Sequence, residues 1–122
     1  MDEFRRVGCD KMKGLHLLSE FYGCDKNTEL LYDETRLNET SHKLIKKCGL
    51  TPVGTCFYKF DGPEELQSGV TGCIILAESH LAIHTWPELS GITLDIYVCN
   101  FSKDNRKSVK LIFNELKELF QP

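Results

Sequence analysis

The segment 92–99 alternates strictly between apolar and other residues, and this alternation constrains the fold more than any other feature of the chain. The apolar residues occupy every second position: Ile92, Leu94, Ile96 and Val98. The residues between them are Thr93, Asp95, Tyr97 and Cys99. Because successive side chains of a strand point to opposite faces, the pattern predicts a strand with one buried face. A sheet with one apolar face must bury it against a second layer.

The remaining segments supply the rest of the sheet and that second layer. Strand-like composition predicts four further strands, at 15–22, 52–60, 70–77 and 80–85, and Gly, Pro and acidic residues mark 61–69 as a loop. A helix is expected between Asp33 and Gly49, with an apolar face made of Leu37, Ser41, Leu44, Ile45 and Cys48. A last helix, capped by Ser102, would bury Val109, Ile112, Phe113, Leu116, Leu119 and Phe120. The order β-α-β-β-β-β-α predicts an α+β two-layer sandwich: a mostly antiparallel sheet with two helices on one face.

Length and composition exclude several classes of protein. The 122 residues suffice for one domain, which we expect at 14–122 after a loose N-terminal extension at 1–13. With 41% hydrophobic and 27% charged residues the chain is not a disordered one, and a net charge of −3 gives no reason to expect nucleic-acid binding. No apolar run approaches the ~20 residues that span a bilayer, so we expect no membrane partner.

The cysteines fit the compartment that the N-terminus suggests. The first residues lack the apolar core of a signal peptide, so we expect a cytoplasmic protein. Six cysteines are then expected to be mostly small buried thiols rather than disulfides. No C-x-x-C pair supports a structural zinc site.

Chemistry is concentrated in the segment ESHLAIHTWPE, residues 78–88. It holds two acids, two histidines, a serine and the only tryptophan. Ser79 and His84 would suit a nucleophile and its base, although a serine at a strand end is usually a turn residue and a histidine in a strand usually has a structural role. The spacing of His80 and His84 would suit a metal only on a helix, so no metal is expected here. Residues five apart in a strand face opposite ways, so Ser79 and His84 could cooperate only if the chain bends near Glu78.

This segment resembles the processing segment of the bacterial and archaeal S-adenosylmethionine decarboxylases, small pyruvoyl-dependent enzymes of polyamine (spermidine) synthesis. Three further stretches carry the resemblance. GLHLLSEFYGCD (14–25) is similar to the family's first strand, and GVTGCIILA (69–77) to the strand before its cleavage point. DIYVC (95–99) is similar to the strand that ends in the family's catalytic cysteine. The resemblance runs from about Gly14 to Phe120.

The resemblance implies a chain that makes its own cofactor. Ser79 would attack the carbonyl of Glu78, the peptide would become an ester, and elimination would cut the chain between residues 78 and 79. A pyruvoyl group would remain at Ser79, with no pyridoxal phosphate and no metal. Its ketone would form a Schiff base with the substrate and accept the electrons that decarboxylation releases. His84 matches the histidine that assists elimination, and Thr71 stands where the family usually has a serine that supports processing.

The resemblance also implies the substrate and the residues that meet it. Cys99 matches the family's proton donor, and a thiol is a plausible acid near neutral pH. Phe60 resembles the aromatic residue that stacks on adenine, and Phe57 is nearby in the sequence. Glu88 matches the carboxylate that holds the ribose hydroxyls. The implied reaction is decarboxylation of S-adenosylmethionine by a homodimer of cleaved protomers.

Some positions depart from the family pattern, and alternatives therefore stay open. Leu15 stands where arginine is common, the stretch 89–93 after Glu88 reads LSGIT, and Asn100 replaces a common glycine. The same machinery could decarboxylate arginine or ornithine instead. The chain could also be a non-catalytic regulatory partner of an active homologue, or a metal-binding or purely structural domain. Retention of Ser79, His84 and Cys99 together argues against an inactive partner.

Overall fold

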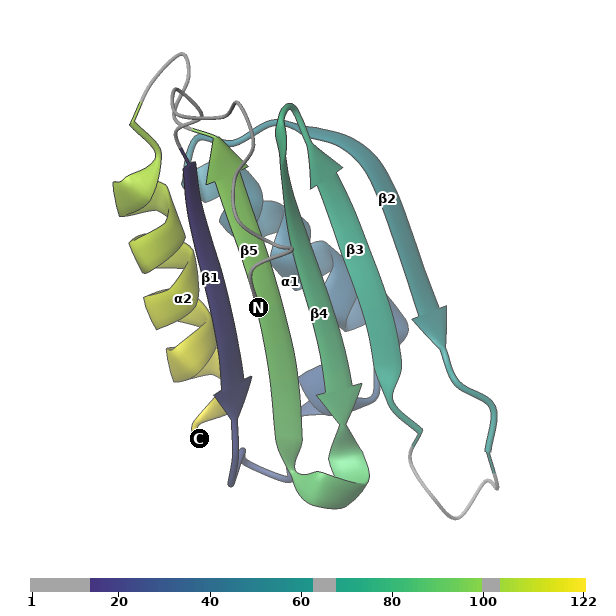
Figure 1. Cartoon of the computed structure of the whole chain (residues 1–122). Coiled ribbons are helices and arrows are strands. Elements are labelled where there is room, and N and C mark those ends of the chain that lie inside the picture. Colours follow the sequence, from purple (N-terminus) through teal and green to yellow (C-terminus); the bar gives the residue numbers. More distant parts are fainter. Residues whose placement is uncertain (1–13, 63–67, 100–103) are drawn as a thin grey trace, which may run out of the picture.

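The sheet is a single five-stranded antiparallel one, and both helices cover the same face of it (Figure 1). The computed structural model describes residues 14–62, 68–99 and 104–122. The strands are β1 (Gly14–Phe21), β2 (Pro52–Lys59), β3 (Val70–Leu76), β4 (Ser79–Trp86) and β5 (Gly91–Cys99), in the spatial order β1-β5-β4-β3-β2. The helices are α1 (Glu34–Lys47) and α2 (Arg106–Phe120), with short 3-10 turns η2 (Glu29–Leu31) and η3 (Pro87–Leu89). The predicted two-layer α+β sandwich is confirmed.

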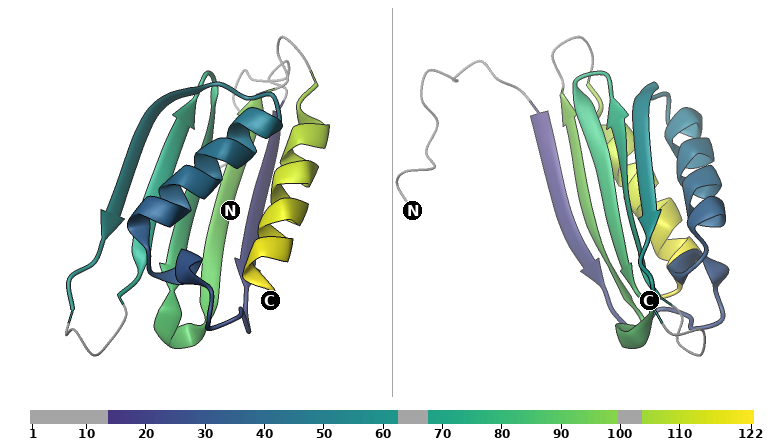
Figure 2. Two further views of the ribbon diagram at one scale, coloured as in Figure 1. Left: turned by 180° about the vertical axis from the view of Figure 1, so that it is seen from behind. Right: turned by 90° about the vertical axis from the view of Figure 1, so that its right-hand side faces the viewer.

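The sheet therefore has a closed face, packed against the helices, and an open face. In the edge-on view of Figure 2, α1 and α2 lie on one side of the sheet, and no other described element covers the opposite side. None of the helices in the described ranges is long and apolar enough to cross a bilayer. The expected extension at 1–13 lies outside the described residues.

The closed face holds the hydrophobic core, and the alternation in β5 has the predicted consequence. Ile92, Leu94, Ile96 and Val98 are each 3% exposed or less. The predicted inner face of α1 is buried throughout: Leu37, Ser41, Leu44, Ile45 and Cys48. In α2 the buried residues are Val109, Ile112, Leu116 and Phe120. Phe113 is partly buried, whereas Leu119 is 38% exposed, so its predicted place in the core is wrong.

The helix ends follow the sequence signals in α1 but not in α2. The side chain of Asp33 accepts a hydrogen bond from the Arg36 amide (3.0 Å), and Gly49 ends the helix with a φ of 80°. Helix α2 begins later than expected, with Asn105 at the N-cap position. There the Asp104 carboxylate accepts from the Arg106 amide (3.0 Å). The predicted cap, Ser102, lies outside the described residues, and Asn105 holds that position instead.

The open face carries most of the polar chemistry of the sheet. Because directly paired residues share a face, the register sets rows of side chains that run across the strands. One row contains His16, Tyr97, His80 and Ile75. The next contains Leu18, Asp95, Ala82, Cys73 and Cys56. A third contains Glu20, Thr93, His84, Thr71 and Tyr58.

Candidate active site

Ser79 lies at the tip of the hairpin that joins β3 to β4. The two-residue turn of Ala77 and Glu78 precedes it, and Ser79 pairs with Leu76 as the first residue of β4. Glu78 has a φ of 63°, in the left-handed region, which costs a non-glycine residue about 1–2 kcal/mol. The peptide between Glu78 and Ser79 is therefore exposed at a turn and follows a strained residue. A bend is thus present near Glu78, but it lies in the hairpin turn before β4 rather than between Ser79 and His84.

The Ser79 hydroxyl is held next to Cys99, which comes from a different strand. The Cys99 amide donates a hydrogen bond to Ser79 Oγ (3.2 Å). Cys99 is the last residue of β5 and half-buried, and it alternates with the open-face residues Asp95 and Tyr97. The structure thus brings together two of the predicted catalytic residues, twenty positions apart.

The other described cysteines differ from Cys99 in their surroundings. Cys24 and Cys48 are buried, and burial raises the pKa of both thiols. Cys73 does not lie in an apolar environment, as its neighbours in the sequence suggest, but on the open face opposite Cys56. Burial, then the nearby Asp95 and Cys56, raise the pKa of the Cys73 thiol. The five cysteines within the described residues are free thiols.

Thr71 and His84 form a second pair in the middle of the open face. They are direct partners across β3 and β4, and Thr71 Oγ1 lies 3.1 Å from His84 Nδ1. Ser79 comes five residues before His84 in β4, which corresponds to a separation of about 17 Å at the usual rise of a strand. The bend at Glu78 does not shorten this separation, because it precedes the strand. Within one chain, His84 does not reach Ser79.

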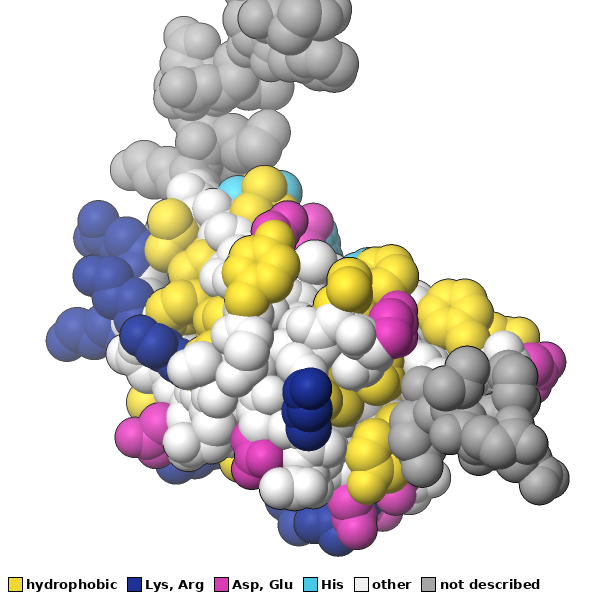
Figure 3. Space-filling view, turned by 90° about the horizontal axis from the view of Figure 1, so that it is seen from below, with side chains coloured by type: hydrophobic (Ala, Val, Ile, Leu, Met, Phe, Trp, Pro, Cys, Tyr) yellow, Lys and Arg dark blue, Asp and Glu magenta, His cyan; other side chains and the backbone are white. Residues whose placement is uncertain are grey.

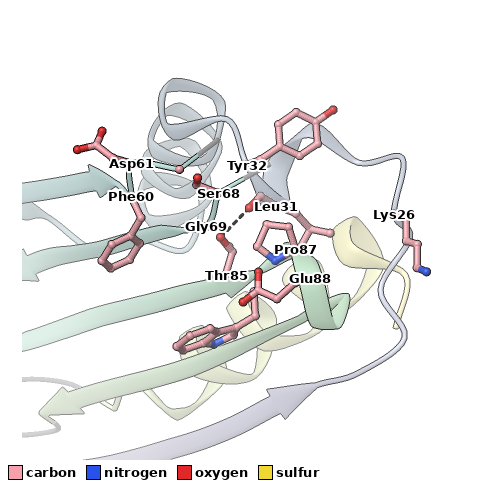
Figure 4. Close-up of a pocket in the computed structure, with 12 residues that line it drawn as sticks. Lys26, Leu31, Tyr32, Phe60, Asp61, Ser68, Gly69, Thr85, Pro87 and Glu88 are labelled. Carbon is pink, nitrogen blue, oxygen red and sulfur yellow. Dashed lines mark hydrogen bonds between the residues drawn. The ribbon is translucent and has the colours of Figure 1, made fainter. Parts of the chain in front are cut away.

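A cavity of about 610 Å³ opens at the other end of the sheet. Its lining includes Phe60, at the end of β2, and Glu88, in η3, which approach it from different sides (Figure 4). Thr85, which also lines the cavity, connects two other segments. Its hydroxyl donates a hydrogen bond to the Leu31 carbonyl (2.7 Å) and accepts one from the Val70 amide (2.8 Å). Figure 3 views this end of the molecule, where hydrophobic side chains are interspersed with carboxylates.

Not every predicted binding residue lines this cavity. Phe57 lies on the closed face, where its ring covers Gly72 and packs against the core, so we remove it from the candidate substrate site. Leu15 also packs against the core, which places the departure from arginine away from the cavity. The altered stretch 89–93 directly follows Glu88 and contains the left-handed Ser90 (φ 49°). Asn100 lies outside the described residues.

Sequence reasoning missed several residues of the cavity. Lys26, Tyr32 and Asp61 contribute to its lining from segments between the regular elements. Their composition marks turns and loops, and nothing in their spacing connects them to Phe60 or Glu88.

A further group missed from the sequence lies on the open face, across β1, β5 and the start of β4. His16 Nε2 and His80 Nε2 lie 2.5 Å and 3.1 Å from the same carboxylate oxygen of Asp95. Burial acts to raise the pKa of the Asp95 carboxyl, but hydrogen bonds from the two histidines outweigh it and leave the pKa below its ordinary value. The chain positions of these residues, 16, 80 and 95, gave no signal of their contact.

Comparison with known proteins gives one consistent family. The family model for S-adenosylmethionine decarboxylase matches residues 15–119. An S-adenosylmethionine decarboxylase proenzyme of Archaeoglobus fulgidus is 35% identical over 104 residues, covering 85% of this chain and 87% of the relative. One of Thermosipho africanus is 34% identical over 111 residues (91% and 77%). The crystal structure of the adenosylmethionine decarboxylase from Aquifex aeolicus superimposes with a TM-score of 0.76 at 28% identity, covering 92% and 83% of the two chains.

Proposed function

The chain belongs to the S-adenosylmethionine decarboxylase family, and from this premise we propose that it is a proenzyme that cuts itself between Glu78 and Ser79 and then decarboxylates S-adenosylmethionine. The observation that carries the proposal is the geometry of the hairpin tip. The peptide to be cut follows the left-handed Glu78, and the Ser79 hydroxyl is anchored by the Cys99 amide. The product would supply the aminopropyl donor for spermidine synthesis.

Self-cleavage uses groups that the chain itself provides. The Ser79 hydroxyl attacks the Glu78 carbonyl, so that a C–O bond forms while the peptide C–N bond breaks. Loss of the Ser79 α-proton then expels the Glu78 carboxylate, and hydrolysis of the resulting enamine releases ammonia and leaves a pyruvoyl group on residues 79–122. Relief of the strain at Glu78 favours the first step.

The residues around Ser79 fit the cofactor that this reaction leaves. The pyruvoyl ketone supplies an electron sink for decarboxylation, which no ordinary side chain offers. Cys99 is the candidate proton donor, because the hydrogen bond from its amide to the Ser79 hydroxyl places the end of β5 beside the residue that becomes the pyruvoyl group. A thiol at the end of β5, beside the start of β4, is within reach of a substrate held at residue 79.

The distances within one chain favour a site that a second copy completes. Ser79 and Cys99 lie at one end of the sheet, whereas Phe60 and Glu88 lie at the other. The length of β4 alone separates Ser79 from Trp86 by about 23 Å. We therefore infer a symmetric homodimer in which the two open faces pack together in opposite directions. Ser79 of one copy would then lie over the cavity and the Thr71–His84 pair of the other.

The open face has the composition that such a dimer needs. Large hydrophobic side chains are exposed on it: Leu18 (69%), Ile75 (53%), Tyr58 (53%) and Trp86 (43%). Patches of this kind mark interfaces more often than free surface. In a two-fold symmetric pair each copy contributes the same patch, and two equivalent sites result.

The cavity supports S-adenosylmethionine over arginine or ornithine. Phe60 offers an aromatic face for adenine, and Glu88 can accept hydrogen bonds from ribose hydroxyls. An adenosyl group would fill a cavity of about 610 Å³ better than a guanidinium would. The named relatives favour the same substrate, and the presence of Ser79, His84 and Cys99 together does not favour a purely regulatory partner.

Intact mass spectrometry tests the cut. The purified wild type should consist of chains 1–78 and 79–122, the second blocked by a pyruvoyl group. Ser79→Ala should remain one chain, since it has no hydroxyl to attack Glu78. A wild type that stays whole on prolonged incubation would contradict the proposal.

Mixing two inactive variants tests the dimer. His84→Ala keeps Ser79 but lacks the processing histidine, and Ser79→Ala keeps the histidine. If the histidine acts on the partner, coexpression of the two should cut the His84→Ala chain. Coexpression of His84→Ala with a Ser79→Ala, His84→Ala double variant is the control and should give no cut. If neither mixture contains any cut chain, the histidine acts within its own chain.

A further inference from the structure

We propose that His16, His80 and Asp95 form a binding site for a divalent transition metal of the Zn²⁺ class on the open face, across β1, β5 and β4. The three residues come from three neighbouring strands, β1, β4 and β5. His16 and His80 are both direct partners of Tyr97, on either side of it, and Asp95 is two residues from Tyr97 along β5. The register thus places two imidazoles around one carboxylate without any loop.

The ligand atoms already converge. Both Nε2 atoms approach the same Asp95 oxygen, at 2.5 Å and 3.1 Å, and the three ligand atoms lie within 4.8 Å of one another. Tetrahedral ligands at metal distances of ~2.0–2.1 Å lie about 3.4 Å apart. Small side-chain rotations therefore suffice to admit an ion, which would replace the two hydrogen bonds.

The donor set selects the kind of ion. Two imidazole nitrogens and one carboxylate oxygen suit Zn²⁺, Co²⁺, Ni²⁺ or Cu²⁺, whereas Mg²⁺ and Ca²⁺ prefer sites made of oxygen. Three protein ligands leave a further coordination position open to water. In a single protomer the ligand side chains are 38–49% exposed, so an ion can reach them there. In the proposed dimer they would lie between the two open faces.

The site is not the His80 and His84 pair, whose spacing suits a metal only on a helix. His84 follows His80 at a spacing of four, but in the sheet the His84 side chain is hydrogen-bonded to Thr71. The partner of His80 is instead His16, whose ring centroid lies 6.1 Å away in an edge-on arrangement. The site rests on the residues of this chain alone, and its test does not depend on self-cleavage.

Cobalt binding to the chelator-stripped full-length protein tests the site. Co²⁺ should bind with one equivalent per chain, give the intense visible absorption of a tetrahedral ion, and be displaced by Zn²⁺. The near-ultraviolet spectrum should lack a thiolate-to-cobalt charge-transfer band, because no cysteine belongs to the ligand set. The same titration on Ser79→Ala separates this result from processing, since that variant stays uncut under the proposed function.

Substitutions then identify the ligands. His16→Ala and Asp95→Asn should weaken Co²⁺ binding about 100-fold or more, since even loss of a residue that only orients a ligand costs 10–100-fold. His16→Gln can still donate a hydrogen bond to Asp95 but lacks the imidazole ligand, and should lose binding while unfolding at the wild-type temperature. His42→Ala is the matched control, because His42 lies on α1 and contacts Thr55.

Three results would overturn the site. One is that the wild type binds no Co²⁺, and another is that His16→Gln binds it as tightly as the wild type. The third is a thiolate band that disappears in Cys73→Ala, which would move the metal to a cysteine.

Discussion

The two faces of the sheet are built from the same strands and differ in almost every other respect. On the closed face Ile83 and Ile96 are 1% and 0% exposed and belong to the hydrophobic core. Their immediate neighbours on the open face, His84 and Asp95, are partly exposed and hydrogen-bonded. One step along a strand thus separates residues that hold the fold together from residues to which we assign chemistry in the proposals above. Paired substitutions of neighbours can test how completely the two roles are divided.

The largest effect is expected from Cys99→Ala on the open face. If Cys99 is the proton donor, turnover by the processed enzyme should fall about 10²–10⁴-fold, the usual contribution of a general acid. The free energy of unfolding should change little, because the side chain is only half-buried. Steady-state decarboxylation and denaturant unfolding measure the two quantities. The neighbour Val98, fully buried, is the control: Val98→Ala should lower stability while turnover per folded molecule stays near wild type.

Ile83→Ala tests the closed face. Removing a large buried side chain should lower the free energy of unfolding by about 2–5 kcal/mol. His84→Ala, one residue on, should change it by less than about 1 kcal/mol while self-cleavage slows severely. Urea unfolding of both variants in a Ser79→Ala background keeps all chains uncut and comparable. Equal losses of stability would mean that the open face contributes to the fold as much as the core does.

Glu88→Gln tests the cavity at the end of the sheet. Loss of the charged acceptor for the ribose hydroxyls should weaken binding of S-adenosylmethionine by about 1–3 kcal/mol and should raise KM more than it lowers kcat. Phe60→Ala should act in the same direction through lost stacking. Leu89→Ala, next to Glu88 but 66% exposed and outside the cavity lining, should leave KM unchanged. Carboxyl-labelled substrate gives these constants through released CO₂.

The smallest effect lies outside both faces, at the start of α2. Hydrogen bonds from the Arg106 side chain and amide lower the pKa of Asp104 from 3.8 to about 2. A lowered folded-state pKa gives stability that is present above pH 4 and is lost as the pH falls toward 2. Asp104→Asn should therefore be slightly less stable than wild type at pH 6, and the difference should vanish near pH 2. Thermal unfolding across this range measures it; a constant difference would assign the effect to helix capping alone.

The sequence was most informative where local patterns determine structure. The alternation at 92–99 predicted both β5 and its buried side, and Asp33 and Gly49 marked the ends of α1. The start of α2 was missed because the helix begins near Asp104 and Asn105 rather than at Ser102. Leu119 was assigned to the core because helical periodicity does not show how wide a stripe the sheet covers.

The site was predictable only as far as motifs reach. Resemblance to a family supplied Ser79, His84 and Cys99 as candidates, and the period of a strand showed that the first two face apart. The order of the strands could not be read from the chain, because it depends on which edges pair in three dimensions. For that reason the contact of Thr71 with His84 and that of His16 with His80 emerge only from the sheet register. The cavity lining emerges only from the way the strand ends and loops pack in three dimensions.

The strand order also determines how many molecules a cut protomer releases when it unfolds. Chain 79–122 would contain the adjacent strands β4 and β5, which pair on their outer edges with β3 and β1 of chain 1–78. The smaller chain is thus inserted into the sheet of the larger one, and neither can leave without breaking two ladders of hydrogen bonds. Unfolding of a cut protomer releases two molecules instead of one, so its melting temperature should rise with protein concentration. The uncut Ser79→Ala protomer gains no such dependence from its own chain.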